Sequence, residues 1–287
     1  MSNNLIKELI DVLQEKLMKT ISFTAVKGGV GKTTLTYNFG EWLAAEGFQV
    51  LMIDNDPQSS LSQTYELYES EKTVADIYRQ NGVEPKIHKM KKGLDILPST
   101  LGLERVNEEL QTVSQKDFQL IGWYNEHFDN VISQYDFILI DNHPDFSTIT
   151  KNAVLVSDYI ISPVEPGEYS WISKSNMESR FNHFIETCID PLTRESYVTG
   201  TLKFVGNRVK HNTKTSREFL EAIAQSDQFL GWFAEKELFN KSTTEHISIV
   251  EMMNRQEYRR HGDFFADTNR LFQTILSETA KSHLGDD

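Results

Sequence analysis

The feature that most constrains this chain is a glycine-rich segment, VKGGVGKTT, at residues 26–34. It follows an apolar run typical of a buried strand, residues 20–26, and leads into a helix-like segment, residues 33–47, that ends at Gly47. A second apolar run follows at residues 48–54. A strand, loop, helix and strand in this order form a parallel pair with a right-handed crossover, so the segment predicts an α/β fold.

The glycine-rich segment has the chemistry of a phosphate-binding loop. The usual pattern is G-x-x-x-x-G-K-[ST]; Gly31, Lys32 and Thr33 fit its end, whereas Val26 stands where the first glycine is expected. Glycines let backbone N–H groups surround phosphate oxygens, and the start of the following helix favours negative charge. Lys32 is expected to reach the β- and γ-phosphates and Thr33 to coordinate Mg²⁺. We therefore predict ATP and Mg²⁺ as cofactors. The expected nucleotide contacts in the loop are Gly28, Gly29, Val30, Gly31, Lys32, Thr33 and Thr34.

Strand and helix patterns alternate through the rest of the chain, which is typical of a doubly wound sheet. Further strands are expected at residues 94–99, 135–141, 158–164, 201–209 and around 232–240. Helical spacing is expected at residues 58–92, 103–134, 147–156, 169–188 and 262–281, with a basic run at 86–92. We predict one α/β domain over residues 20–287, with a mostly parallel sheet flanked by helices. Residues 1–19 predict an amphipathic helix that packs on this domain or contacts a partner.

Composition argues against several other classes. The net charge of −13 argues against a surface coated in basic residues, although a local basic patch stays possible. Cys188 is the single cysteine, so a disulfide or a cysteine-ligated cluster within the chain is not expected. No run of about 18 apolar residues occurs, so no transmembrane helix is expected. We predict a cytoplasmic protein that does not bind membranes.

The segment KGGVGKTT resembles the deviant Walker A box of the ParA/MinD family of P-loop ATPases, and Lys27 matches that family's signature lysine. The resemblance implies that Lys27 crosses a dimer interface and touches the nucleotide of the partner subunit. A cation supplied in this way would offset charge on the transferring phosphoryl group. ATP would then hold two subunits of a homodimer together, and hydrolysis would release them.

Two further segments resemble motifs of the same family. LMIDNDPQ, residues 51–58, resembles its DxDPQ box, which implies that Asp56 positions the attacking water and that Asp54 supports the Mg²⁺ region. FILID, residues 137–141, resembles a Walker B strand, whose closing carboxylate, Asp141, can hold a Mg²⁺-bound water.

Later positions are less regular. The segment NHPD at residues 142–145 replaces the two prolines usual in the family, and His143 is either a general base or a solvated loop residue. Asn207, near the end of a later strand, resembles the position at which an asparagine contacts adenine. The expected catalytic residues are therefore Lys27, Lys32 and Asp56; the expected metal site is Thr33, Asp54 and Asp141.

The family resemblance favours plasmid or chromosome partition. That use implies an ATP-bound homodimer on non-specific double-stranded DNA, associated with the nucleoid, and a ParB-like centromere-binding partner that stimulates hydrolysis. Basic residues in two segments are candidate phosphate contacts, or else ordinary solvated helix faces. They are Lys210, Lys214, Arg217, Arg255, Arg259 and Arg260.

Other uses of the same scaffold remain as alternatives. A MinD-like positioning ATPase needs a basic C-terminal amphipathic helix, whereas this chain ends SETAKSHLGDD. A nitrogenase-type iron protein needs two cysteines from each subunit. A related kinase or biosynthetic enzyme would need a tyrosine cluster or a second substrate site, and neither stands out.

Overall fold

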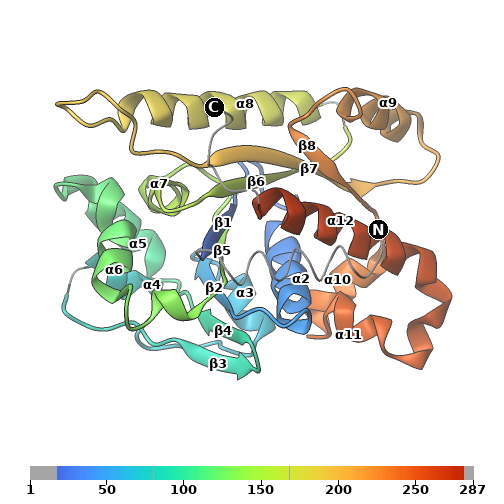
Figure 1. Cartoon of the computed structure of the whole chain (residues 1–287), viewed down its shortest axis with the longest axis horizontal. Coiled ribbons are helices and arrows are strands. Elements are labelled where there is room, and N and C mark those ends of the chain that lie inside the picture. Colours follow the sequence, from blue (N-terminus) through green and yellow to red (C-terminus); the bar gives the residue numbers. More distant parts are fainter. Residues whose placement is uncertain (1–17, 80, 168, 281–287) are drawn as a thin grey trace.

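The computed structural model describes residues 18–79, 81–167 and 169–280. In these residues an eight-stranded sheet has the order β3-β4-β2-β5-β1-β6-β7-β8 (Figure 1). Neighbouring strands pair in parallel except β3 and β4, which are antiparallel. The strands are β1 Lys19–Phe23, β2 Val50–Asn55, β3 His88–Lys91, β4 Leu94–Leu97, β5 Phe137–Asn142, β6 Tyr159–Val164, β7 Thr201–Val209 and β8 Phe229–Ala234. The predicted mostly parallel α/β sheet is confirmed.

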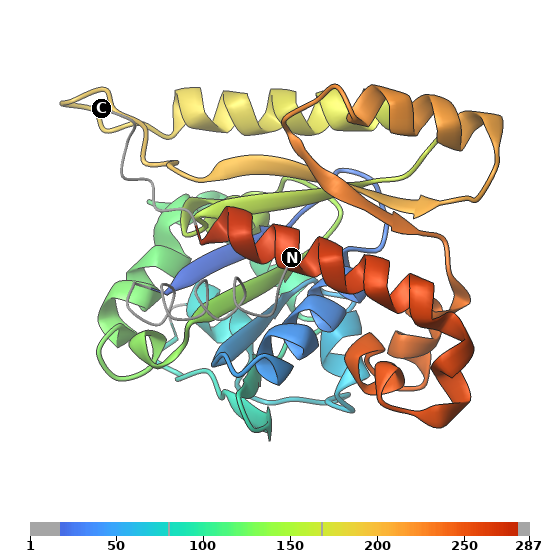
Figure 2. The same cartoon turned by 45° about the vertical axis from the view of Figure 1, so that its right-hand side comes forward.

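Helices cover both faces of this sheet, as a doubly wound fold requires (Figures 1 and 2). One face is covered by α2 Lys32–Ala45, α10 Glu237–Thr244, α11 Ile249–Met253 and α12 Gly262–Thr279. The opposite face is covered by α4 Val74–Arg79, α5 Leu103–Glu109, α6 Gln119–His127, α7 Thr148–Leu155, α8 Ser170–Thr187 and α9 Lys214–Ile223. The short α3, Ser60–Thr64, follows β2, and 3-10 turns lie at η1 Leu110–Thr112, η2 Lys116–Phe118, η3 Ile132–Gln134 and η4 Gln256–His261.

The central strand β5 shows why both faces must be covered. Phe137 and Leu139 lie in the core beneath α2, while Ile138 and Ile140 lie in the core on the opposite face. Because successive strand residues point to opposite faces, an uninterrupted apolar strand buries side chains in two layers. The continuous apolar runs in the sequence therefore predict a sheet sandwiched between helices.

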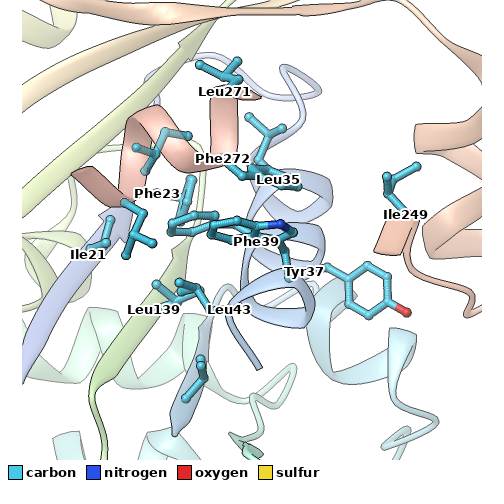
Figure 3. Close-up of a cluster of buried hydrophobic side chains, with 14 of the residues drawn as sticks. Ile21, Phe23, Leu35, Tyr37, Phe39, Leu43, Leu139, Ile249, Leu271 and Phe272 are labelled. Carbon is cyan, nitrogen blue, oxygen red and sulfur yellow. The ribbon is translucent and has the colours of Figure 1, made fainter. Parts of the chain in front are cut away.

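Helix α2, which carries the end of the glycine-rich loop, is itself a core element. Phe39 stacks on Trp42 with ring centroids 6.0 Å apart and also contacts Phe272 of α12 (Figure 3). A Cβ at Gly40 would lie 2.5 Å from Met52 Cε of β2, so this glycine allows the helix to approach the sheet closely. Asn38 donates to Ser242 Oγ at 2.8 Å and accepts from the Ile249 N–H at 2.8 Å. The loop is thus attached to a helix that packs against β2, α10, α11 and α12.

Several local predictions were wrong. The region 58–92 is not mainly helical: it holds the short helices α3 and α4, and its basic run forms part of β3. Side chains on β3 alternate between half-buried and exposed, and lysines are tolerated there because β3 is an edge strand. The strand expected near 232–240 is β8, which ends at Ala234, and residues 237–240 belong to α10.

Two other expectations are only partly met or fall outside the described chain. Helical structure in the range 103–134 is broken into α5, α6 and the turns η1, η2 and η3. The predicted amphipathic helix at residues 1–19 lies almost wholly outside the described residues, which begin at Met18. Among the helices of the described ranges, none combines the length and apolar character needed to cross a bilayer.

Candidate nucleotide-binding site

The three acidic residues singled out in the sequence meet at the carboxyl ends of neighbouring strands. Asp54 at the end of β2 is in register with Asp141 at the end of β5, and Asp141 is also in register with Phe23 at the end of β1. Asp56 follows β2 directly and is almost buried. Ligands of open parallel sheets bind beyond the carboxyl ends of the strands, so the sheet topology itself puts a site here.

The loop from β1 to α2 rises above these carboxylates. Gly29 and Gly31 have φ of +78° and +92°, a left-handed conformation that glycine adopts without strain. The loop is exposed at Lys27, Gly28 and Gly29. The Val30 side chain is buried and packs the middle of the loop against the protein. Gly31 caps α2, so the helix starts at Lys32, as an anion-binding helix N-terminus requires.

Asp141 is a buried carboxylate that lacks ordinary partners. Its side chain is fully buried, and neither carboxylate oxygen makes a hydrogen bond of normal geometry within the described residues. Burial raises the pKa of Asp141 to about 8; the nearby Lys32 ammonium and Thr33 hydroxyl oppose that rise, and Asp54 and Asp56 add to it. An orphaned buried carboxylate is costly, and a cation or a cation-bound water would supply what it lacks.

Asp54 differs from Asp141 because the protein already satisfies it. Its Oδ2 accepts from the Ser62 N–H at 2.7 Å and the Ser62 hydroxyl at 2.6 Å, and its Oδ1 accepts from the Asp56 N–H at 3.2 Å. Burial raises the pKa of Asp54 to about 7, and these hydrogen bonds act in the opposite direction. The predicted metal role is therefore better matched by Asp141, while Asp54 holds α3 and the segment after β2 in place.

The arrangement fits a partly protein-bound Mg²⁺. Within the described residues, no group of three or more His, Cys, Asp or Glu side chains is placed to hold a metal by itself. Mg²⁺ commonly takes one or two protein oxygens and completes its shell with phosphate and water. The Asp141 carboxylate and the neighbouring Thr33 hydroxyl suit such an incomplete set.

A hollow of about 650 Å³ opens in front of the loop. Lys32 reaches it while almost buried, and burial lowers the pKa of its ammonium, opposed by Asp141, Asp56 and Asp145. His143 also lines it and lies with Nδ1 3.3 Å from Asp145 Oδ2. Gln58 and Pro144, from the two motifs quoted above, also line it. Residues of the hollow that the sequence did not single out are Ser60, Gln63, Thr64, Tyr68, Arg208, Thr243, Thr244 and His246.

Buried asparagines tie the strand ends beneath the site together. Asn55 Nδ2 donates to Asn142 Oδ1 at 2.8 Å, and Asn142 Nδ2 donates to Thr24 Oγ1 at 3.1 Å. The Tyr78 hydroxyl donates to Asn55 Oδ1 at 2.9 Å. The sequence analysis did not predict this network. The signal for it was an asparagine directly after the aspartate of two apolar strands, Asn55 after Asp54 and Asn142 after Asp141.

Asn207 reaches the loop from β7. Its Nδ2 donates to the Val30 carbonyl at 2.7 Å, and the side chain packs against Gly31. Next to it lies a hollow of about 270 Å³ whose walls include Leu35 and Phe239. The walls are mostly polar, and the part contributed by α10 carried no motif in the sequence.

Lys27 is held loosely beside the loop. Its side chain is 55% exposed, and its ammonium lies 3.9 Å from the Glu165 carboxylate. The same carboxylate accepts from Arg208 Nη1 at 2.8 Å. Lys27 therefore remains accessible from outside the chain, as a residue that acts on a second subunit must be.

The two basic segments lie apart. Lys214 and Arg217 are on α9, whereas Arg259 and Arg260 are on η4, next to Arg255; α9 lies at the upper right and the segment between α11 and α12 at the lower right of the molecule (Figures 1 and 2). Lys214 is 87% exposed and pairs with Glu218 one turn along, 3.6 Å away. Lys210 lies 4.0 Å from Glu235. The predicted DNA contacts therefore do not form one continuous patch.

A phosphate loop above strand-end carboxylates in a doubly wound parallel sheet defines the class of P-loop nucleotide-binding proteins. Comparison with known families places the chain further. The AAA_31 family, described as an AAA domain, matches residues 18–193, more than half of the chain. The chain belongs to this family and is a P-loop ATPase of the ParA/MinD type.

Three curated relatives illustrate the range of similarity. An uncharacterized protein of Methanocaldococcus jannaschii is 31% identical over 72% of this chain and 80% of its own length. The sporulation initiation inhibitor protein Soj of Bacillus subtilis is 31% identical over 53% of this chain and 60% of its own length. The maintenance of carboxysome distribution protein A of Synechococcus elongatus is 25% identical over 91% of this chain and 99% of its own length.

Solved structures share the fold. A plasmid partition protein from Borrelia burgdorferi has a TM-score of 0.70 at 22% identity, over 92% of this chain and all of the other. The ATP complex of a Cyanothece McdA variant has a TM-score of 0.74 at 19% identity, over 90% of this chain and 96% of the other. Cobyrinic acid a,c-diamide synthase from Mycobacterium smegmatis, with an ATP analogue and magnesium, has a TM-score of 0.61 at 18% identity, over 74% and 82% of the two chains.

Proposed function

We propose that this chain is a Mg²⁺-dependent ATPase that partitions DNA. The observation that carries the ATPase part is the orphaned carboxylate of Asp141 beneath a loop in which Gly29 and Gly31 have positive φ. Mg²⁺ would supply charge neutralisation on the phosphates. Lys32 would bind the β- and γ-phosphates, Thr33 and Asp141 would hold the metal or its waters, and Asp54 would keep the segment after β2 in position.

Asp56 is the residue we assign to the attacking water. It lines the hollow in front of the loop, and its Oδ1 accepts from the Gln58 N–H at 2.9 Å, which fixes the carboxylate's direction. A base must reach the nucleophile it orients, and Asp56 is the carboxylate that faces this hollow from the β2 side. Asp56→Ala is expected to bind ATP and stop before hydrolysis, which phosphate release and retention of bound ATP would measure together.

We assign Lys27 to the partner subunit's nucleotide in an ATP-bound homodimer. Its exposure and its long, weak ion pair with Glu165 support a side chain that can leave its own subunit at little cost. Lys27→Ala is then expected to bind ATP while losing both dimerisation and hydrolysis. Unchanged turnover in that variant would show that Lys27 does not act in trans.

We propose that the ATP-bound dimer binds non-specific DNA. A ParB-like centromere-binding protein is the partner that we expect to stimulate hydrolysis. Support comes from the relationship to Soj and from the structural likeness to a plasmid partition protein. The exposed lysine and arginine of α9 are the best-placed phosphate contacts, since Arg217 also lies at the mouth of an open groove between α9 and β8. Such contacts would be independent of DNA sequence.

A second candidate is positioning of a protein assembly. The carboxysome distribution relative matches almost the whole of both chains, whereas Soj matches about half of this one. Both candidates share the ATP-gated dimer and differ in which partner protein stimulates it.

The decisive experiment is a titration of non-specific duplex DNA with ATP, with ADP and without nucleotide, at two salt concentrations. Partition predicts binding that requires ATP and weakens steeply with salt. Absence of DNA binding in every state would refute the DNA role and leave the ATPase assignment to be judged by phosphate release alone.

A further inference from the structure

Two consecutive residues of β7 donate hydrogen bonds to the carbonyls of two consecutive residues of the phosphate loop. Arg208 Nη1 donates to the Gly29 carbonyl at 2.6 Å, and Asn207 Nδ2 donates to the Val30 carbonyl at 2.7 Å. These residues lie 179 and 177 positions away from the loop in the sequence. Arg208 lines the hollow in front of the loop, but it has been given no role so far, and nothing in the motif analysis pointed to it.

The backbone at Arg208 is unusual for a strand. Its φ is +53°, a left-handed conformation that a long side chain adopts at a cost. The pairing of β7 with β8 shifts register between Gly206 and Val209, across this residue. Bulges of this kind re-aim a side chain, and here the guanidinium is directed back to the loop instead of outward along the pleat.

The guanidinium is held in that direction from a second side. Arg208 Nη1 also donates to Glu165 Oε1 at 2.8 Å, just after β6. The Ser170 hydroxyl donates to the Glu165 carbonyl and, at 2.7 Å, to the Gly167 carbonyl, so the segment after β6 is itself tied down. Both contacts come from Nη1, whose two N–H bonds can serve a carbonyl and a carboxylate at once.

Peptide geometry links these carbonyls to phosphate binding. In a trans peptide unit the C=O and the N–H point in opposite directions. The Gly29 carbonyl shares its unit with the Val30 N–H, and the Val30 carbonyl shares its unit with the Gly31 N–H. Holding both carbonyls toward β7 therefore turns both N–H groups to the opposite side, where a phosphate loop needs them.

We propose that Asn207 and Arg208 form a carbonyl clamp that orients the loop for phosphate before nucleotide arrives, with Arg208 as a positioning residue. This inference rests on the proposed function, since it assumes that the loop binds ATP. The clamp acts on N–H groups of the loop and not on the terminal phosphate. It therefore contributes equally to ATP and to ADP.

The test compares variants by titration with fluorescent mant-ATP and mant-ADP in Mg²⁺. Arg208→Asn removes the guanidinium but keeps a residue that tolerates positive φ. It is expected to raise Kd about tenfold for both nucleotides, the loss of one charge-assisted hydrogen bond. Arg194→Asn is the matched control, because Arg194 also has a left-handed φ of +66° and is exposed. It is expected to change Kd by less than about twofold.

Two results would overturn the clamp. A loss confined to ATP would place Arg208 on the γ-phosphate instead. Full affinity for both nucleotides in Arg208→Asn would show that the contact with the Gly29 carbonyl does not orient the loop. The clamp predicts that this variant is weakened for both nucleotides.

Hydrogen exchange separates the clamp from the proposed function. In the absence of nucleotide, amides in the peptide spanning residues 26–34 are expected to exchange faster in Arg208→Asn than in the wild type or in Arg194→Asn. Equal exchange in all three would refute the clamp. A wild type that binds neither nucleotide would refute the proposed ATPase, and the exchange result would still decide whether β7 orders the loop.

Discussion

The strand-end site and the basic segments of α9 and η4 both carry charge, but they bury it to very different degrees. Asp54 and Asp141 are fully buried, and each must be compensated by a hydrogen bond, a counter-charge or a ligand. Lys214 is almost fully exposed and pairs with a residue of its own helix. A solvated charge needs no further explanation, whereas a buried one does. The buried charges of the strand-end site therefore depend on the fold around them, whereas the exposed charges of the basic segments do not.

The largest effect is expected from Lys32, whose ammonium lies buried among carboxylates. Lys32→Ala should weaken ATP binding at least about 100-fold, because it removes the charge-assisted contacts to two phosphates. Isothermal titration calorimetry measures this loss. The exposed Lys89 of β3 provides the control, and Lys89→Ala should bind as the wild type does. Normal affinity in Lys32→Ala would contradict the assignment of the loop.

Asp54 and Asp141 should differ in folding stability. Asp54→Asn sets an amide against the N–H and hydroxyl of Ser62, and it should lower the free energy of unfolding by about 2 kcal/mol. Asp141→Asn removes a buried carboxyl whose raised pKa disfavours the folded state at neutral pH, and it should leave that free energy unchanged or raise it. Urea unfolding without nucleotide measures both. Equal destabilisation would mean that the two carboxylates are held alike.

The dependence of ATP binding on Mg²⁺ should test the role of Asp141 at the metal. Wild-type ATP binding should weaken about tenfold when EDTA removes Mg²⁺, and Asp141→Asn should lose most of that difference. The exposed Asp129 supplies the control, since Asp129→Asn should keep the full response to the metal. A persistent Mg²⁺ effect in Asp141→Asn would move the metal site to other oxygens.

The smallest effects are expected on the exposed basic segments. Lys214→Glu and Arg217→Glu should each weaken ATP-dependent DNA binding by about threefold and reduce the salt slope by about 1. The pair Arg255→Glu and Arg259→Glu on the separate segment is the comparison. Fluorescence anisotropy with a non-specific duplex would show which segment, if either, contacts phosphates, because the two pairs of residues lie on different elements.

Much of the fold follows from local patterns. The apolar strands ending at Phe23, Asp54 and Asp141 could be read directly, because parallel strands buried on both faces need uninterrupted apolar runs. The edge strand β3 could not, because exposed lysines suit a solvated helix and a charged edge strand equally well. The long range assigned as helix between residues 103 and 134 failed for a related reason, since helical spacing does not reveal where the chain turns.

The sequence by itself determined the chemistry of the loop and the direction of the strands around it. Glycines, Lys32 and Thr33 carry that information locally, because the loop and the start of α2 form one continuous segment of the chain. Only the tertiary structure decided that Asp54 is satisfied while Asp141 is not, and that the two basic segments are apart. It alone brought Asn207 and Arg208 to the loop, because a contact across 177 or more positions depends on strand order, register and a bulge that local pattern does not encode.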